Sequence, residues 1–196
     1  MKKLLTLVLA TCMLFCLVSC SVEKVQRGTI DGNVYKSEYS GITFTKPDGW
    51  VFSTDEEIAE IMNIGSDMLD KSKFETAVAE IATTYDMMVN DPISGSSVSI
   101  SYENLAVTNN EDKTLEEYVD VVLNQLKNQT VIEYKFSDPE SFSLCGESYT
   151  RVITTASYSG VEMTQAYYMR KIEDIVVGVI ITAVNTELSE IEAMFA

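Results

Sequence analysis

The chain contains no histidine among its 196 residues. Histidine is the commonest general base, the usual partner of serine and cysteine nucleophiles, and the commonest ligand of transition metals. Its absence argues against the ordinary catalytic triads and against histidine-based metal centres. The sequence also lacks a Gly-x-Gly-x-x-Gly motif, a phosphate-binding loop and a Gly-x-Ser-x-Gly motif. We therefore assign no catalytic residue, no cofactor and no metal site from the sequence, and expect a protein that is not an enzyme.

Cysteine is scarce in the body of the chain. Three of the four cysteines lie within the first twenty residues, and only Cys145 follows them. One cysteine can form neither an internal disulfide nor a cysteine-rich metal site. Cys145 could be a reactive thiol, but it stands at the start of a strand-like region, which favours a small buried apolar filler.

Basic residues are also scarce. The chain has 14 lysines and arginines against 30 acidic residues, a net charge of −16. Such a domain is repelled by nucleic acid and by anionic membrane surfaces. We therefore expect no nucleic-acid partner.

The first twenty residues have the features of a secretory signal peptide. Lys2 and Lys3 precede an apolar run from Leu4 to Val18, and Leu17-Val18-Ser19-Cys20 closes it. This closing sequence resembles a bacterial lipobox. The resemblance implies that a type II signal peptidase cuts before Cys20, whose sulfur is lipidated and whose new amino group is acylated. A retained single-span anchor and an ordinary cleaved signal are the alternatives, and the run is shorter than the roughly 20 residues that span a bilayer.

The predicted lipoprotein signal determines the expected organisation of the chain. Residues 1–19 form the signal peptide, residues 20–32 a lipidated flexible tether, and residues 33–196 a single globular domain. The tether has mixed charge and no sustained period. We expect the domain to be anchored by lipid to a bacterial membrane, on its extracytoplasmic side.

Apolar periodicity predicts the elements of the domain. Capping boxes at Thr54/Glu57, Ser72/Glu75 and Thr114/Glu117 predict the starts of three helices. The strands are expected at Tyr35–Tyr39, Ile42–Lys46, Tyr85–Val89, Val98–Tyr102, Val131–Phe136, Ser148–Ser157, Val161–Lys171 and Ile175–Val184, with a short closing helix near Thr186. The strand at Ile175–Ala183 is apolar at nearly every position, which predicts cover on both of its faces. The fold class is therefore α+β, an antiparallel sheet with helices on both faces.

The hairpin and turn at Tyr35–Trp50 and the meander at Tyr149–Val184 resemble the PsbP-like α/β/α sandwich. Bacterial lipoproteins of unknown function often carry that fold. The resemblance implies a sheet of about six to seven strands. It implies no functional residues, because a shared scaffold does not carry a shared site.

Two acidic clusters are candidate binding sites. The segment Asn109–Asp112 could bind calcium through oxygen ligands, or could be a solvated loop that leads into the helix at Thr114. The other cluster, on the first turns of a helix, consists of Asp55, Glu56, Glu57 and Glu60. Acidic side chains there interact favourably with the helix dipole, which explains their presence without a ligand.

Aromatic and sulfur side chains give further candidates. Trp50, Tyr158, Tyr167 and Tyr168 could stack on a sugar or a peptide, although aromatic residues are commoner in cores. Tyr167 and Tyr168 are adjacent on a strand and should point to opposite faces. Met87-Met88 could bind a soft metal, but adjacent residues on a strand alternate between faces and suit packing better.

Three functions fit these observations. The first is a non-catalytic binding or accessory module that is lipid-anchored at the cell surface and recognises an unknown protein or envelope ligand. The second is a membrane-tethered hydrolase that uses carboxylates alone. The third, from the PsbP-like resemblance, is an assembly factor for a membrane complex.

Overall fold

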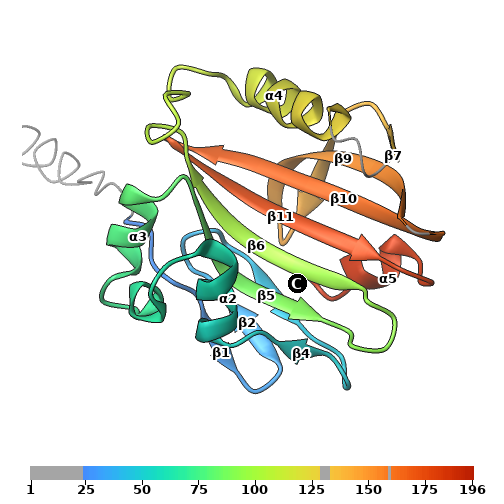
Figure 1. The fold of residues 1–196 in the computed structure, drawn as a ribbon, viewed down its shortest axis with the longest axis horizontal. Coiled ribbons are helices and arrows are strands. Elements are labelled where there is room, and N and C mark those ends of the chain that lie inside the picture. Colours follow the sequence, from blue (N-terminus) through green and yellow to red (C-terminus); the bar gives the residue numbers. More distant parts are fainter. Residues whose placement is uncertain (1–23, 129–132, 159) are drawn as a thin grey trace, which may run out of the picture.

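The structure is a computed structural model that describes residues 24–128, 133–158 and 160–196 (Figure 1). The expected signal peptide and Cys20 lie outside the described residues. The strands are β1 (Thr29–Asp31), β2 (Val34–Lys36), β3 (Thr43–Thr45), β4 (Val51–Phe52), β5 (Thr83–Asn90), β6 (Ser97–Asn104), β7 (Glu133–Phe136), β8 (Glu140–Leu144), β9 (Glu147–Tyr158), β10 (Val161–Ile172) and β11 (Ile175–Ala183). The helices are α2 (Asp55–Met62), the short 3-10 helix η1 (Ser66–Leu69), α3 (Phe74–Glu80), α4 (Leu115–Lys127) and α5 (Leu188–Glu192). Among these described helices, none has the length and apolar character needed to cross a bilayer.

Eight strands form one antiparallel sheet. Its order is β4-β5-β6-β11-β10-β9-β7, and β8 also pairs with β9. The strands β1, β2 and β3 form a separate small sheet. The predicted opening hairpin is therefore present as β2 and β3, but it takes β1 as its third strand and does not join the main sheet. The α+β class and the large antiparallel sheet are confirmed, with eight strands where about six to seven were predicted.

The first core lies on one face of the main sheet. Val98, Ile100 and Tyr102 of β6 are buried on this face, and the serines between them are half-buried on the other. This is the alternation that the sequence predicts. The residues packed onto this face come from the small sheet, α2, α3 and α5, and include Tyr35, Phe44, Ile58, Phe74 and Ile191.

The second core lies between the opposite face and α4. The helix begins at Thr114, whose capping box with Glu117 forms as predicted. Its buried residues Tyr118, Val119 and Leu123 pack with Val152, Tyr167, Met169 and Val176 of the sheet. Tyr168 belongs to the first core and Tyr167 to the second, so the two point to opposite faces. Helices on both faces of the sheet are therefore confirmed.

One local prediction is wrong, and one strand was not predicted. The capping box expected at Ser72/Glu75 does not form, because α3 begins one residue later, after Lys73, which provides no side-chain cap. The strand β8 was not predicted at all. It pairs with β9 through a two-residue turn, Cys145-Gly146, in which both residues have a positive φ. Such a turn joins antiparallel strands without splaying them.

The prediction of a flexible tether over residues 20–32 is wrong for its later residues. Thr29–Asp31 form β1 and pair with Val34–Lys36. Gly32, at φ 59°, makes the turn between the two strands. Because Arg27 and Gly28 also contact the domain, as described below, the folded region begins well before Asn33.

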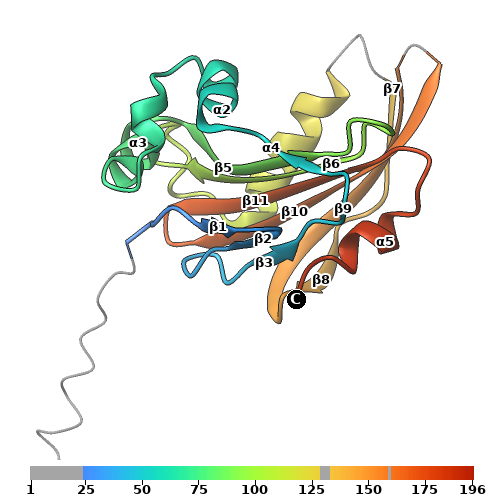
Figure 2. The ribbon, with the colours of Figure 1, turned by 90° about the horizontal axis from the view of Figure 1, so that it is seen from below.

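The last residues close the small sheet. Phe44 and Phe195 form an antiparallel bridge, and their rings lie 5.0 Å apart. The Thr45 amide donates to Met194, and the Ala196 amide donates to Thr43. The edge of β3 is thereby covered by the C-terminal segment (Figure 2).

Candidate functional site

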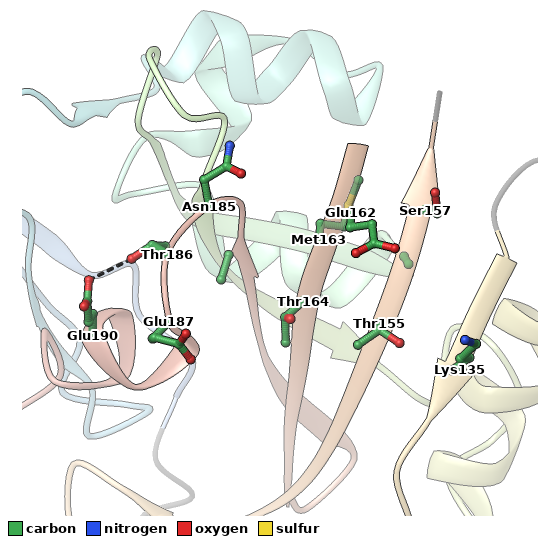
Figure 3. Close-up of a pocket in the computed structure, with 12 residues that line it drawn as sticks. Lys135, Thr155, Ser157, Glu162, Met163, Thr164, Asn185, Thr186, Glu187 and Glu190 are labelled. Carbon is green, nitrogen blue, oxygen red and sulfur yellow. Dashed lines mark hydrogen bonds between the residues drawn. The ribbon is translucent and has the colours of Figure 1, made fainter. Parts of the chain in front are cut away.

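A polar cavity of about 880 Å³ opens at one end of the main sheet (Figure 3). It is lined by β7, β9, β10, the end of β11 and the loop after it, and α5. The lining residues are Lys135, Thr155, Ala156, Ser157, Glu162, Met163, Thr164, Ala183, Asn185, Thr186, Glu187 and Glu190. We call this the distal cavity.

The register of four strands builds the floor of the distal cavity. Lys135 of β7 lies opposite Thr155 of β9, which lies opposite Thr164 of β10, which lies opposite Ala183 of β11. Directly opposite residues on antiparallel strands stand side by side on one face. The floor is therefore a row with an ammonium group at one end, two hydroxyls in the middle and a small apolar residue at the other end.

The loop after β11 forms the wall beside Ala183. Ser96 fixes this loop, because its hydroxyl donates to the Val184 carbonyl and accepts from the Val184 amide. Asn185 then takes a left-handed φ of 56°. The Thr186 hydroxyl donates to Glu190 at 2.8 Å, which ties the loop to α5. The wall is held by the fold itself and presents Glu187 toward the strands, whereas the Glu190 carboxylate is turned toward Thr186 (Figure 3).

Charged groups in the distal cavity have few partners of their own. Within the residues that the structure describes, Lys135, Glu162 and Glu187 make no side-chain hydrogen bond or ion pair, and only Glu190 is engaged, by Thr186. Carboxylates accept hydrogen bonds, and an ammonium group only donates them. The cavity thus offers three acceptor carboxylates, one cationic donor and a floor of hydroxyls, a set suited to a ligand rich in hydroxyl and amino groups.

The distal cavity lies far from where the chain enters the fold. Residues 24–31 run along the end that holds α3, whereas the cavity-lining ends of β7, β9 and β10 and the loop after β11 lie at the opposite end (Figure 2). Both views of the ribbon agree on this arrangement.

A second polar cluster is buried in the first core around Asp86. The carboxylate accepts hydrogen bonds from the hydroxyls of Tyr35 at 2.6 Å and Tyr102 at 2.9 Å, and from the Gly28 amide at 3.0 Å. Asp86 sits where the pairing of β5 with β6 shifts by one residue, so the bulge turns it into the core. Burial raises the pKa of the Asp86 carboxyl, although the hydrogen bonds act to lower it.

Arg27 links this cluster to the surface. Its guanidinium donates to the Asp55 carboxylate at 2.7 Å and to the Leu69 carbonyl, and it lies 3.9 Å from Asp86. Asp55 is one of the helix acids discussed above, and its pKa is lowered by the hydrogen bond from Arg27. We call the contacts of Arg27 and Gly28 with Asp55 and Asp86 the N-terminal latch. It is a structural site, because every group in it is satisfied by the chain itself.

The candidate calcium loop already holds a cation from the protein. The Lys171 ammonium group donates to the main-chain carbonyls of Glu111 at 2.9 Å and Lys113 at 2.7 Å. Across the described residues, no three acidic or cysteine side chains gather as a metal site would require. The structure therefore favours the solvated loop.

The aromatic candidates are mostly core residues. Trp50, Tyr167 and Tyr168 are each at least nine-tenths buried, and the side chain of Tyr158 lies outside what the structure describes. The Tyr168 hydroxyl donates to Glu192, and that of Tyr167 to Gln165. Of the two methionines, Met87 is buried in the first core, and Met88 packs against it from a half-buried position. None of the described aromatic side chains here presents an open stacking face.

Cys145 is not the buried strand residue that the sequence predicts. It occupies the turn between β8 and β9, is half-buried, and packs against the first core. Burial raises the pKa of the Cys145 thiol, which lowers the fraction of reactive thiolate.

Sequence reasoning missed both polar clusters. The one sequence signal for Asp86 is that it is the only charged residue of β5. The distal cavity had no comparable signal, because its residues come from four strands and a loop that the sequence separates by up to 55 positions, from Lys135 to Glu190.

Comparisons with known proteins find a structural likeness but no family and no activity. No family model matches the chain, and no curated protein matches it in sequence. One similar solved structure is the solution structure of cyanobacterial PsbP (CyanoP) from Synechocystis sp. PCC 6803. It is 13% identical, has a TM-score of 0.47, and the alignment covers 92% of this chain and 98% of that chain. This is a PsbP protein, from the family whose fold the sequence resembles, and the likeness carries no statement about function.

Proposed function

We propose that this protein is a lipid-anchored, extracytoplasmic binding module that holds a polar ligand in the distal cavity. The observation that carries the proposal is the cavity itself, in which Lys135, Glu162 and Glu187 lack partners among the described residues. The ligand class follows from the lining. Carboxylates and hydroxyls recognise amino and hydroxyl groups, as on an amino sugar or a peptide with a free amine.

The expected site of attachment supports the same role. The proposed anchor at Cys20 precedes the end of the domain that holds α3, and the elements that line the distal cavity lie at the other end (Figure 1). A ligand on the envelope side could therefore reach the cavity without approaching the lipid.

The test is a thermal-shift scan of the chain from Ser21 onward, produced without the signal. Starting at Asn33 would remove Arg27 and Gly28 and with them the N-terminal latch. A ligand that binds only the folded state stabilises it by mass action, by about 2.7 kcal/mol at a hundredfold excess over Kd. We expect amino sugars, wall fragments or amine-bearing peptides to raise the melting temperature, and divalent cations to leave it unchanged.

The matched control is the double variant Glu162→Gln and Glu187→Gln. It should lose the ligand-dependent shift while keeping the melting temperature of the free protein. A scan in which no ligand of these classes shifts the original protein would contradict the proposed cavity function.

The anchor has its own test. Cys20→Ala in the full chain should release the protein from membranes or stall its processing. A variant that is processed normally and stays in the membrane fraction would refute lipidation at Cys20 and leave the cavity proposal standing.

A further inference from the structure

The residues that follow the proposed anchor contact the folded domain from Lys24 onward. The Lys24 ammonium group pairs with Glu75 at 2.9 Å, and Val25 packs against the first core. The N-terminal latch follows, with Arg27 on Asp55 and Gly28 on the buried Asp86. Only residues 21–23 therefore separate Cys20 from residues that contact the domain.

This short connection limits how far the domain can stand from the lipid. Four residue steps from Cys20 to Lys24 span at most about 14 Å when fully extended. A folded domain of this length has a radius of gyration of about 16 Å. The connection is therefore shorter than the domain's radius of gyration. This restricts which faces of the domain can lie against the bilayer.

The face around the latch also carries less net negative charge than the chain as a whole. We call it the anchor-proximal face and define it by Lys24, Arg27 and its partner Asp55, η1, and the segment from Asp70 to Glu75. Its basic residues are Lys24, Arg27, Lys71 and Lys73, and its acidic residues are Asp55, Asp67, Asp70 and Glu75. These charges balance, whereas the whole chain carries −16. An anionic lipid surface repels the rest of the domain more strongly than it repels this face.

We propose that the anchor-proximal face lies against the bilayer and that the latch fixes the domain upright, with the distal cavity pointing away from the membrane. The proposal rests on the lipid anchor at Cys20 put forward above. Its partner is a lipid surface, and its physical basis is the short reach of residues 21–23 together with the balanced charge of this face.

The experiment measures energy transfer between the protein and the bilayer. The lipidated protein, in a Cys145→Ser background, is labelled at Ser72→Cys on the anchor-proximal face or at Ile93→Cys. Ile93 is 94% exposed, and it lies in the loop between β5 and β6 at the end near the distal cavity (Figure 1). Vesicles of phosphatidylethanolamine and phosphatidylglycerol carry the acceptor dye on their headgroups.

We expect transfer from the Ser72 label to exceed transfer from the Ile93 label severalfold. A matched variant inserts about ten Gly and Ser residues between Glu23 and Lys24, which adds a mean reach of about 18 Å and leaves the latch intact. The contrast between the two labels should then collapse. An unchanged melting temperature confirms that the insertion has not disturbed the fold.

Three outcomes would count against the proposal in different ways. Equal transfer from the two labels in the original protein would overturn the upright orientation. A contrast that survives the insertion would overturn the short connection as its cause. Protein that fails to stay with the vesicles would refute the anchor at Cys20, and the orientation with it.

Discussion

Asp86 and the acids of the distal cavity are carboxylates of the same acidic domain in opposite surroundings. Asp86 is 2% exposed and accepts hydrogen bonds from two tyrosines and one main-chain amide. Glu162 and Glu187 have no hydrogen-bond partner among the described residues, and both face an open cavity. A carboxylate whose partners are built into the fold serves stability, and one that the fold leaves unpaired is available to a ligand. The variants below test this distinction.

The largest effect is expected from Asp86→Ala. The change leaves two buried hydroxyls and the Gly28 amide without an acceptor, and it opens a void in the first core. We expect the free energy of unfolding to fall by about 3 kcal/mol, measured by urea denaturation. The control is Asp55→Ala, which removes a partly exposed partner of Arg27 and should cost about 1 kcal/mol or less. Equal losses for the two variants would mean that Asp86 is not the structural carboxylate.

Gly28→Ala should be the next most destabilising change. A Cβ at Gly28 would come within 2.4 Å of the Tyr35 ring, whose hydroxyl is held by Asp86. Displacing this buried ring should cost about 2 kcal/mol in the same denaturation experiment. Gly32→Ala is the comparison, because it meets open space and suffers only from a φ of 59°, a cost of about 1 kcal/mol. If Gly28→Ala costs less than Gly32→Ala, the latch is looser than the structure indicates.

The pH dependence of Asp86 sharpens the comparison further. Burial raises its folded pKa above the ordinary value of 3.8, so the folded state holds the proton more tightly than the unfolded state. Its contribution is therefore fully present below pH 3.8 and is lost as the pH rises through the folded pKa. The stability of the original protein relative to Asp86→Asn should decline over this window, as followed by urea denaturation at a series of pH values. A difference that grows with pH would show that the hydrogen bonds outweigh burial.

The smallest effect on stability is expected in the distal cavity. Glu162→Gln and Glu187→Gln, alone or together, should change the free energy of unfolding by no more than about 0.5 kcal/mol, because these side chains support nothing in the described fold. Thermal unfolding without ligand measures this directly. A loss close to that of Asp86→Ala would assign these acids to the structure and remove the basis for the cavity proposal.

The parts of the fold that the sequence predicts are those governed by local patterns. The apolar stripe and the capping box at Thr114 define α4 almost to the residue. The continuous apolar run of β11 correctly indicates cover on both faces. In both cases one repeating pattern, read over neighbouring residues, is enough to identify the element and its buried side.

The failures come from contacts between distant residues. Thr29–Asp31 look like tether because three residues carry too little pattern, and they form a strand only because β2 offers an edge. β8 is missed because the turn at Cys145-Gly146 does not use the common Asn-Gly or Asp-Gly pair. The distal cavity depends on the register of four strands, which no local pattern reports.

The bridge between Phe44 and Phe195 has a consequence for how the domain is made. Until residues 194–196 are available, the outer edge of β3 has unpaired amide and carbonyl groups, and such an edge can pair with another chain. Because Thr43 and Thr45 bond to residues at 194–196, the small sheet cannot be completed until those residues have been synthesised. Removing residues 193–196 should therefore promote aggregation before it alters the main sheet, and a tag fused directly after Ala196 would crowd that same edge.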